Sequence, residues 1–378
     1  MRKVLLLGAS GSIGSQTLDI LDKYSDRFKL TAFSVGHRSE IIPALIAKYK
    51  DVKDIYLIDN KKKNNYQKQY PNINFYSGKN GLVNITKKAT YDMCVDALVG
   101  FSGMEPAIIT LKRNKILCLA NKEALVAGGT IINRLLKNGH GKLYPIDSEH
   151  VAIAKCFSRV NKDDVSKIMI TASGGALRNL PLERLNDVTP EEALAHPTWK
   201  MGNKITIDCA TMMNKGFEII EAYYLFNYPL DKIEVLMHDE SLVHSLLRLK
   251  DGTLVADYGK PDMHNPIEYA LLESKSNYEV MKVKSLDEFK DSHFHTYNKD
   301  RYPLCELAKK CLVEGASKMI ALNAANEVAV SRFLNHDISF PMIYEIVKKV
   351  VDNTKLNKNP SLKEIKLIDK LAREEANR

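Results

Sequence analysis

The chain has 378 residues, a formal net charge of +9, and an ordinary balance of 45% hydrophobic and 27% charged residues. No apolar run approaches the length that a bilayer-spanning helix needs, and one hydrophobic core rarely grows this large, so we expect two or three domains. Basic residues are scattered among acidic ones, which argues against a nucleic-acid-binding stripe. The six cysteines are dispersed without a C-x-x-C pair, which argues against a zinc or redox site and predicts a cytoplasmic location.

The first part of the chain alternates short apolar runs with helical patterns. The apolar runs that fit buried parallel strands are Val4–Leu7, Leu30–Val35, Ile55–Ile58, Met93–Leu98 and Ile116–Leu119. The helical patterns between them include Ser12–Lys23, Ile41–Lys48 and Pro106–Lys112. This alternation predicts an α/β fold over residues 1–146, a Rossmann-like dinucleotide-binding domain with helices on both faces of its sheet.

The rest of the chain has a different pattern. Strand patterns at Lys167–Thr171 and Ile233–Met237 lie on either side of a helical stretch, Thr211–Phe226, and Asp251-Gly252 between two apolar runs is a strong hairpin signal. We therefore expect a central α+β catalytic domain over residues 147–273. Residues 274–300 are polar and irregular and are predicted as a linker. Amphipathic helical patterns follow, so residues 301–378 are predicted as a small C-terminal helical domain.

A glycine-rich turn follows the first expected strand and opens the first expected helix. Gly8, Gly11 and Gly14 would let a pyrophosphate approach the backbone, where the helix N-terminus offers free N–H groups. Ser10 and Ser12 can add hydroxyl donors. The spacing is a variant of the dinucleotide-binding pattern, and a plain strand-to-helix turn remains the alternative.

The end of the second strand bears on the choice of dinucleotide. Enzymes that bind NAD place Asp or Glu there to hold the ribose hydroxyls. This chain has Gly36-His37-Arg38, and its first acid is Glu40. A cationic pair suits the 2′-phosphate of NADP, although a surface arginine would look the same.

Three carboxylates are candidates for a metal site. Asp147 and Glu149 are two residues apart, so an extended backbone would point both side chains the same way, and Glu218 would come from a helix of the next domain. Carboxylate oxygens suit Mg²⁺ or Mn²⁺ better than zinc. Acidic residues near helix starts are also common as caps and surface charges, and for an isolated Asp-x-Glu that explanation would be preferred.

Further residues suit an anionic substrate. Ser173-Gly174-Gly175 follows a strand and offers a hydroxyl and backbone N–H groups, while Asn214 and Lys215 offer an amide and a positive charge. His196 lies in a segment that carries the only Trp of the chain, Trp199, between Pro197 and Gly202. Such a segment is typical of a mobile lid that covers a substrate.

Together these segments resemble 1-deoxy-D-xylulose 5-phosphate reductoisomerase, the NADPH-dependent enzyme family of the non-mevalonate isoprenoid pathway. The resemblance covers nearly the whole chain in order. It is carried by Gly8–Gly14, Ala120–Glu123, Pro145–His150, Thr171–Gly175, His196–Gly202, Ala210–Glu218, Pro261–Met263 and Leu322–Glu327. It implies a homodimer that rearranges and reduces 1-deoxy-D-xylulose 5-phosphate to 2-C-methyl-D-erythritol 4-phosphate with NADPH and Mg²⁺ or Mn²⁺.

The resemblance also implies roles for individual residues. The residues that would contact NADPH are Ser10, Gly11, Ser12, Ile13, Gly36, His37, Arg38, Asn121, Glu123 and Gly202. The metal ligands would be Asp147, Glu149 and Glu218, which with Lys122 form the catalytic set. The sugar phosphate would be held by Lys122, Ser148, Glu149, Ser173, His196, Cys209, Asn214, Lys215 and Glu218, and covered by Trp199.

Four positions depart from the pattern of the family. His37-Arg38 stands where the family usually has Lys or Arg and then Asn, so the 2′-phosphate contact shifts toward Arg38. Cys209 replaces a serine, and a thiol is a weaker donor to phosphate. Gly175-Ala176-Leu177 replaces Gly-Pro-Phe in a loop, and Ala172 replaces Gly or Ser with little consequence expected.

Two other classes of function remain in view. A simple NADP-dependent dehydrogenase of a polar carbonyl compound would use the glycine-rich turn but leave the three carboxylates without a function, and a metal requirement distinguishes the two. A dinucleotide sensor or nucleic-acid-binding protein would need a basic helix pair or a basic stripe with aromatics, and the sequence has neither. The C-terminal helices alone are compatible with a purely structural role.

Overall fold

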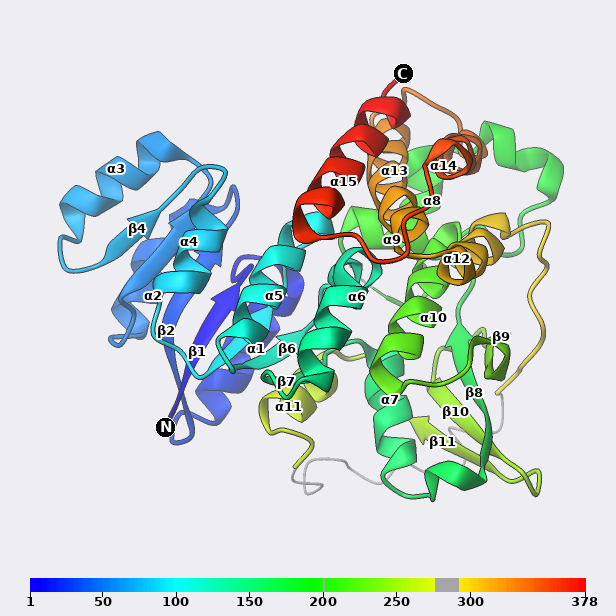
Figure 1. Cartoon of the computed structure of the whole chain (residues 1–378), viewed down its shortest axis with the longest axis horizontal. Helices are drawn as coiled ribbons and strands as arrows, with labels where there is room; N and C mark the ends of the chain where they lie inside the picture. Colours follow the sequence, from blue (N-terminus) through cyan, green and yellow to red (C-terminus); the bar gives the residue numbers. More distant parts are fainter. Residues whose placement is uncertain (200, 276–291) are drawn as a thin grey trace. The chain divides into compact units, whose positions relative to one another are not determined.

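The chain, seen in a computed structural model (Figure 1), divides into two compact units, and the structure describes residues 1–199, 201–275 and 292–378. The first unit comprises Met1–Ala124, Ile131–Asp147 and Met263–Ser276, and the second comprises Leu125–Thr130, Ser148–Asp262 and Asn277–Arg378. The predicted α/β class is confirmed. Among the described residues, no helix has the length and apolar character needed to cross a membrane.

The first unit is built on a seven-stranded sheet. Its strands are β1 (Arg2–Leu7), β2 (Phe28–Val35), β3 (Asp54–Leu57), β4 (Asn74–Tyr76), β5 (Met93–Asp96), β6 (Ile116–Leu119) and β7 (Lys142–Pro145). Every neighbouring pair is parallel, in the order β4-β3-β2-β1-β5-β6-β7. The order reverses between β1 and β5, and such a reversal is where doubly wound sheets bind ligands, at the carboxyl ends of the strands.

Helices bury both faces of this sheet, which explains why its strands are near-continuous apolar runs. The helices are α1 (Ser12–Lys23), α2 (Ile42–Lys48), α3 (Asn60–Gln69), α4 (Gly81–Lys88), α5 (Met104–Lys112), α6 (Lys122–Lys137) and α11 (His264–Leu271), with short 3₁₀ turns η1 (Ser39–Ile41) and η2 (Gly100–Gly103). Ile20 of α1 and Ile267 of α11 belong to the core that includes Val4 and Leu6. Ile85 of α4 packs with Leu5 and Leu7 in the core of the opposite face.

The second unit contains a smaller sheet of four strands. These are β8 (Val165–Ala172), β9 (Ile233–Met237), β10 (Val243–Leu249) and β11 (Leu254–Tyr258), in the order β11-β10-β8-β9. β10 is antiparallel to β8 and β11, whereas β8 and β9 are parallel. The hairpin predicted at Asp251-Gly252 joins β10 to β11, and Gly252 takes the left-handed φ of +91° that such a turn requires.

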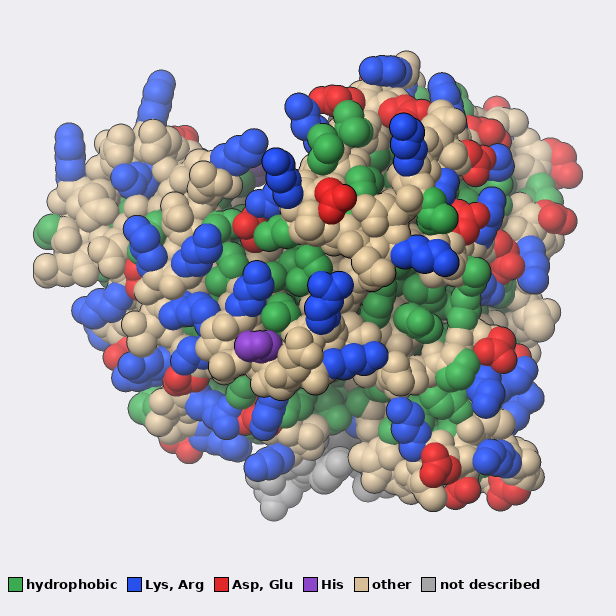
Figure 2. Space-filling model, viewed as in Figure 1, with side chains coloured by type: hydrophobic (Ala, Val, Ile, Leu, Met, Phe, Trp, Pro, Cys, Tyr) green, Lys and Arg blue, Asp and Glu red, His purple; other side chains and the backbone are tan. Residues whose placement is uncertain are grey.

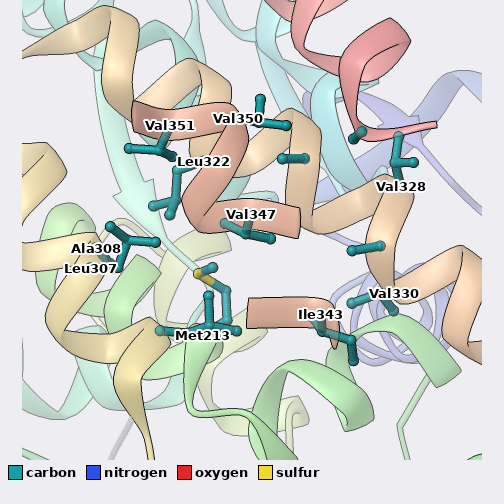
Figure 3. Close-up of a cluster of buried hydrophobic side chains, with 14 of the residues drawn as sticks. Met213, Leu307, Ala308, Leu322, Val328, Val330, Ile343, Val347, Val350 and Val351 are labelled. Atoms are coloured by element: carbon teal, nitrogen blue, oxygen red, sulfur yellow. The ribbon is translucent and has the colours of Figure 1, made fainter. Parts of the chain in front are cut away.

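Helices form the larger part of the second unit. They are α7 (Ser148–Phe157), α8 (Pro190–Leu194), α9 (Asn203–Ala210), α10 (Met213–Phe226), α12 (Pro303–Glu314), α13 (Ala316–Leu334), α14 (Met342–Asn353) and α15 (Leu362–Ala376), with 3₁₀ turns η3 (Lys162–Asp164), η4 (Leu182–Asp187) and η5 (Leu230–Lys232). Figure 3 shows that Met213 of α10 lies among apolar side chains of α12, α13 and α14, including Leu307, Leu322 and Val347. This core fixes α10, which carries three of the predicted site residues.

Several predicted boundaries were wrong, such as that of the strand expected over Met93–Leu98, which ends at Asp96. The helix expected over Thr211–Phe226 begins at Met213, because Met212 has a left-handed φ of 60° that ends α9 and starts α10 in a new direction. The grouping into units also differs from the predicted division, since α11 belongs to the core of the first unit rather than to residues 147–273. The three-domain division stays a prediction, and most of its linker, residues 276–291, lies outside the described residues.

Charged side chains are spread over the surface. On the face drawn in Figure 2, Lys and Arg side chains of the described residues are scattered and mixed with Asp and Glu.

Candidate active site

The glycine-rich turn of the first unit leaves no room for side chains. A Cβ on Gly14 would lie 2.1 Å from the Gly8 carbonyl oxygen, and one on Gly8, whose φ is +89°, would lie 2.6 Å from the Ala97 oxygen. The Gly8 N–H donates to Ser34 Oγ over 2.8 Å. Gly11 is the N-cap of α1 and no side chain caps the helix. The first-turn N–H groups therefore remain for an anionic ligand at the carboxyl edge of the sheet.

The other predicted dinucleotide contacts of the first unit follow neighbouring strands. Gly36, His37 and Arg38 come directly after β2, and both the His37 and Arg38 side chains are exposed. Asn121 follows β6 and caps α6 by accepting from the Ala124 N–H over 2.8 Å. The structure thus brings nine of the ten predicted residues to one edge of this sheet, and the tenth, Gly202, belongs to the second unit.

The first unit contains a buried ion pair. Lys122, the first residue of α6, donates from Nζ to Asp147 Oδ2 over 2.6 Å, and both side chains are about 8% exposed. Asp147 ends the second of the three segments of this unit, two residues beyond β7. A buried ammonium and a buried carboxylate must pair because either charge alone would be costly to bury.

The second unit holds two further carboxylates around one lysine. Lys215 Nζ lies 2.8 Å from Glu149 Oε1 and 2.5 Å from Glu218 Oε2. Carboxylate oxygens of the two glutamates come within 4.8 Å of each other, and Asn214 Nδ2 donates to Glu218 Oε1 over 2.5 Å. Ser148 donates to Glu149 Oε2 over 2.6 Å. Hard oxygen donors and a cation are therefore concentrated between the starts of α7 and α10.

A second polar group lies in the loops after β8. Ser173 Oγ is 3.0 Å from His196 Nε2, and the Gly175 N–H points to Ser173 Oγ at 3.3 Å. His196 Nδ1 accepts from the backbone N–H of Thr198 and of Trp199. Since Nδ1 is an acceptor, the imidazole proton lies on Nε2 and is donated to Ser173. The β8 loop and the Trp199 segment therefore contact each other, and Lys200 of that segment lies outside the described residues.

The charge state of His196 follows from its surroundings. Burial lowers its pKa below the usual value, and the nearby cations Arg178 and Lys215 lower the pKa further. The imidazole is therefore neutral at pH 7, in agreement with an Nδ1 that accepts two N–H groups. A neutral donor beside two cations suits a multiply charged phosphate.

Two glycines let the β8 loop approach α9. Gly174 and Gly175 have φ of +75° and +70°, and a Cβ on Gly175 would lie 2.6 Å from Ala210 Cα. Cys209, directly before Ala210, is partly buried in the last turn of α9. The structure therefore places Cys209 next to the loop that carries Ser173, and its contact with the substrate stays a prediction.

Sequence reasoning missed several residues that hold this group in place. Arg178 donates to the backbone oxygens of Ser173 and Asp239 over 3.0 and 3.2 Å. His150 is fully buried. Its Nε2 lies 2.9 Å from the backbone carbonyl oxygen of Glu218, and its Nδ1 lies 3.3 Å from Oε2 of Glu221. Arg178 has no sequence signal because its partners are two backbone oxygens and the carboxylate of Asp239, 61 residues away. The position of His150 one residue after Glu149 was a signal that could have been used.

Comparison with known proteins identifies the family. Models of one family match residues 4–129, described as 1-deoxy-D-xylulose 5-phosphate reductoisomerase, and residues 143–226 and 258–375, described as its C-terminal domains. A 1-deoxy-D-xylulose 5-phosphate reductoisomerase of Geobacillus sp. is 40% identical over 375 residues, covering 98% of this chain and 97% of the relative. The chain belongs to the 1-deoxy-D-xylulose 5-phosphate reductoisomerase family. The corresponding protein of Listeria innocua is 37% identical over 99% of this chain and 98% of its own length.

Solved structures of the family share the fold. The Zymomonas mobilis reductoisomerase in complex with NADPH matches with a TM-score of 0.89 and 35% identity over 99% of this chain and 98% of that one. A reductoisomerase in complex with NADPH, fosmidomycin and magnesium matches with a TM-score of 0.92 and 31% identity over 100% and 98%. Both of these solved complexes contain NADPH, and the second also contains magnesium.

Proposed function

We propose that this protein converts 1-deoxy-D-xylulose 5-phosphate to 2-C-methyl-D-erythritol 4-phosphate, using NADPH and a divalent cation, in isoprenoid precursor biosynthesis. The family relationship over the full length supports the reaction. The observation that carries it for this chain is the group formed by Glu149, Lys215 and Glu218, with Asn214 on the same helix. An enzyme that only transfers hydride does not require such a group of carboxylates and a lysine.

The proposed metal ligands are Asp147, Glu149 and Glu218. Their oxygens are the donors that Mg²⁺ and Mn²⁺ prefer. Asp147 is only two residues from Glu149 along the backbone. When bound, the cation would supply Lewis acid polarisation of substrate oxygens. The reductoisomerase structures with magnesium support this assignment.

The lysines and the serine–histidine pair account for the substrate's charge. We assign Ser173, His196, Asn214 and Lys215 to the phosphate group, with Ser148 and Cys209 beside them and Trp199 as the cover. Neutral His196 keeps Ser173 oriented, and Lys215 brings positive charge from α10. Binding the phosphate far from the reacting carbons positions the rest of the substrate. Lys122, held by Asp147, is available to stabilise negative charge on a substrate oxygen.

The dinucleotide is assigned to the carboxyl edge of the first unit's sheet. The uncapped N-terminus of α1 suits the pyrophosphate, and exposed Arg38 and His37 suit the 2′-phosphate. The solved NADPH complexes of related reductoisomerases support this choice of cofactor.

The deciding experiment follows NADPH absorbance with purified protein and 1-deoxy-D-xylulose 5-phosphate, first with Mg²⁺ and then with excess EDTA. Metal-dependent NADPH loss with formation of the branched polyol phosphate, identified by mass spectrometry and NMR, supports the proposal. NADPH loss that continues in EDTA and leaves the carbon skeleton linear would instead identify a simple dehydrogenase. An inactive protein with Mg²⁺ present would require another substrate.

We also propose a cytoplasmic homodimer. The resemblance to the family supports the dimer, and the dispersed cysteines support a reducing location. Sedimentation equilibrium of the purified chain tests the dimer, and a mass of one chain at micromolar concentration would exclude it.

A further inference from the structure

Asp96 is an acidic residue in the core of the first unit that none of the assignments above uses. It is the last residue of β5 and is fully buried. In the parallel ladder it lies opposite Leu7, the residue directly before the glycine-rich turn. Asp96 therefore occupies the point where the strand order reverses, at the edge of the sheet to which the dinucleotide is assigned.

Among the described residues, one hydrogen-bond partner contacts the carboxyl group. Oδ1 accepts a long bond of 3.3 Å from the Leu98 N–H, and among the described residues Oδ2 has no hydrogen-bond partner. Oδ2 faces the backbone of Gly103, because a Cβ there would lie 2.7 Å from Oδ2. The same Cβ would lie 2.9 Å from Asn121 Oδ1. The unused oxygen and the amide of Asn121, a predicted cofactor contact, therefore both lie against Gly103.

Asn121 links Asp96 to the loop after β5, because its backbone N–H donates to the Asp96 carbonyl oxygen over 3.2 Å. Its Nδ2 donates to the Leu98 and Gly100 oxygens, each over 2.8 Å. The residue after Asp96, Ala97, lies against Gly8 so closely that no Cβ fits there. Asp96, the Leu98–Gly103 loop, Asn121 and the glycine-rich turn therefore form one continuous packed group.

The surroundings of Asp96 disfavour a negative charge. Burial raises its pKa to about 7, the Leu98 N–H lowers the pKa, and Glu123 at the start of α6 raises the pKa. The neighbouring strands place uncharged Leu7 and Leu119 beside it, and η2 has no titratable side chain. Other titratable groups on the adjoining elements include Cys94 in β5, Cys118 in β6, Glu105 and Lys112 in α5, Arg2 and Lys3 at the far end of β1, and Lys122, which pairs with Asp147.

We propose that Asp96 is a positioning residue of the cofactor site and takes up a proton from solvent when the dinucleotide binds. The inference rests on the proposed use of NADPH. The phosphates of NADPH bring several negative charges to the turn after β1, and repulsion inside a poorly hydrated region favours the neutral carboxyl group. The neutral group also has an O–H that can donate to Asn121 or to the ligand, which the carboxylate lacks. Binding and protonation are thermodynamically linked, so alkaline pH weakens NADPH binding.

The test is titration calorimetry of the full-length protein with NADPH near pH 7, in buffers of different ionisation enthalpy. The slope against ionisation enthalpy gives the protons taken up. We expect the wild type to take up on the order of 0.5 proton more per NADPH than Asp96→Asn, a neutral side chain of the same shape. The phosphates of NADPH and His37 exchange protons of their own, so the difference between variants carries the assignment. Asp92→Asn, an exposed position at the start of the same strand, is the matched control and should equal the wild type.

The pH dependence gives a second readout. Above about pH 7 the NADPH Kd of the wild type should rise by up to about tenfold per pH unit relative to that of Asp96→Asn. A second uncharged variant, Asp96→Ser, covers the case in which asparagine does not fold. Equal proton uptake and parallel pH profiles in wild type and variants would overturn this inference while leaving NADPH binding intact. A wild type that binds no NADPH would overturn the proposed function together with it.

Discussion

Glu218 is the most deeply buried of the three proposed metal ligands, at 1% exposed. Replacing it by Gln keeps the size and one oxygen but removes the charge that attracts a divalent cation. We expect Glu218→Gln to lower kcat on the order of 100-fold or more and to raise the Mg²⁺ concentration needed for half-maximal rate. Steady-state NADPH oxidation over a Mg²⁺ series measures both.

The control for this variant is Glu234→Gln, on β9 of the same unit, where the side chain is 35% exposed and pairs with Lys167. Its rate should match the wild type. Circular dichroism should show the same fold in both variants. A near-normal rate of Glu218→Gln at low Mg²⁺ would remove Glu218 from the metal site.

Asp96 also predicts how stability changes with pH. Its pKa is raised from 3.8 to about 7 in the folded chain, so the folded state holds a proton that the unfolded state releases between these values. Because the folded state binds more protons, stability falls as pH rises from about 4 to 7, by on the order of 4 kcal/mol from this group. Asp96→Asn should lose less stability over this range in urea unfolding. An identical pH profile would show that Asp96 is ionised when folded.

At the scale of residues, the sequence predicted site residues that lie in short motifs, but not contacts between residues far apart in the chain. Ser173 and His196 were chosen from their segments, and the structure brings them within 3.0 Å. The contact of Asn326 with Asp208 has no such signal, because its partners are 118 residues apart. The roles proposed for these residues stay predictions.

At the scale of elements, the start of α1 depends on Gly14. A methyl group there would lie 2.1 Å from the Gly8 oxygen and 2.7 Å from Ala9 Cα, both of which are backbone atoms that cannot rotate away. In Gly14→Ala the helix must move off the turn, which displaces the N–H groups proposed for the pyrophosphate. We expect the KM for NADPH to rise at least about tenfold, with a smaller change in KM for the sugar phosphate. Ser15→Ala, exposed on the next position, should leave both unchanged.

The contact between α13 and α9 supports a second prediction. Asn326 Nδ2 donates to Asp208 Oδ1 over 2.8 Å, and Lys204 Nζ lies 2.6 Å from the other oxygen. Asp208 precedes Cys209, so α13 holds the turn that faces the phosphate loop. Asn326→Ala should cost about 1–3 kcal/mol of unfolding free energy and raise KM for the sugar phosphate more than KM for NADPH. Ser331→Ala, exposed on α13, is the control, and equal changes in both KM values would contradict a local role.

Predictions of elements succeeded where burial alone decides the pattern. β6 and β9 were predicted with their observed bounds, because strands buried in a sheet read as short apolar runs between turn residues. The break at Met212 was missed because a left-handed methionine leaves no trace in an apolar, helix-forming stretch. The place of α11 in the first unit was missed because its partner, α1, precedes it by more than 200 residues.

At the scale of the whole chain, the two units carry different parts of the proposed chemistry. The first contains the dinucleotide edge and the Lys122–Asp147 pair, and the second contains Glu149, Lys215 and Glu218. The chain passes from one unit to the other between Asp147 and Ser148, inside the motif proposed to bind the metal. A change in backbone geometry at this junction would therefore affect the metal ligands directly.

The net charge of +9 gives a prediction that belongs to the entire molecule. Both proposed ligands are multiply charged anions, and the summed positive field attracts them before any contact forms. Salt shortens the range of this field from about 30 Å at 0.01 M ionic strength to about 10 Å at 0.1 M. We expect KM for NADPH and for the sugar phosphate to rise severalfold over this range at fixed Mg²⁺, with kcat changing much less. Uncharged sucrose at matched viscosity is the control, and KM values that do not respond to salt would mean that local contacts alone attract the ligands.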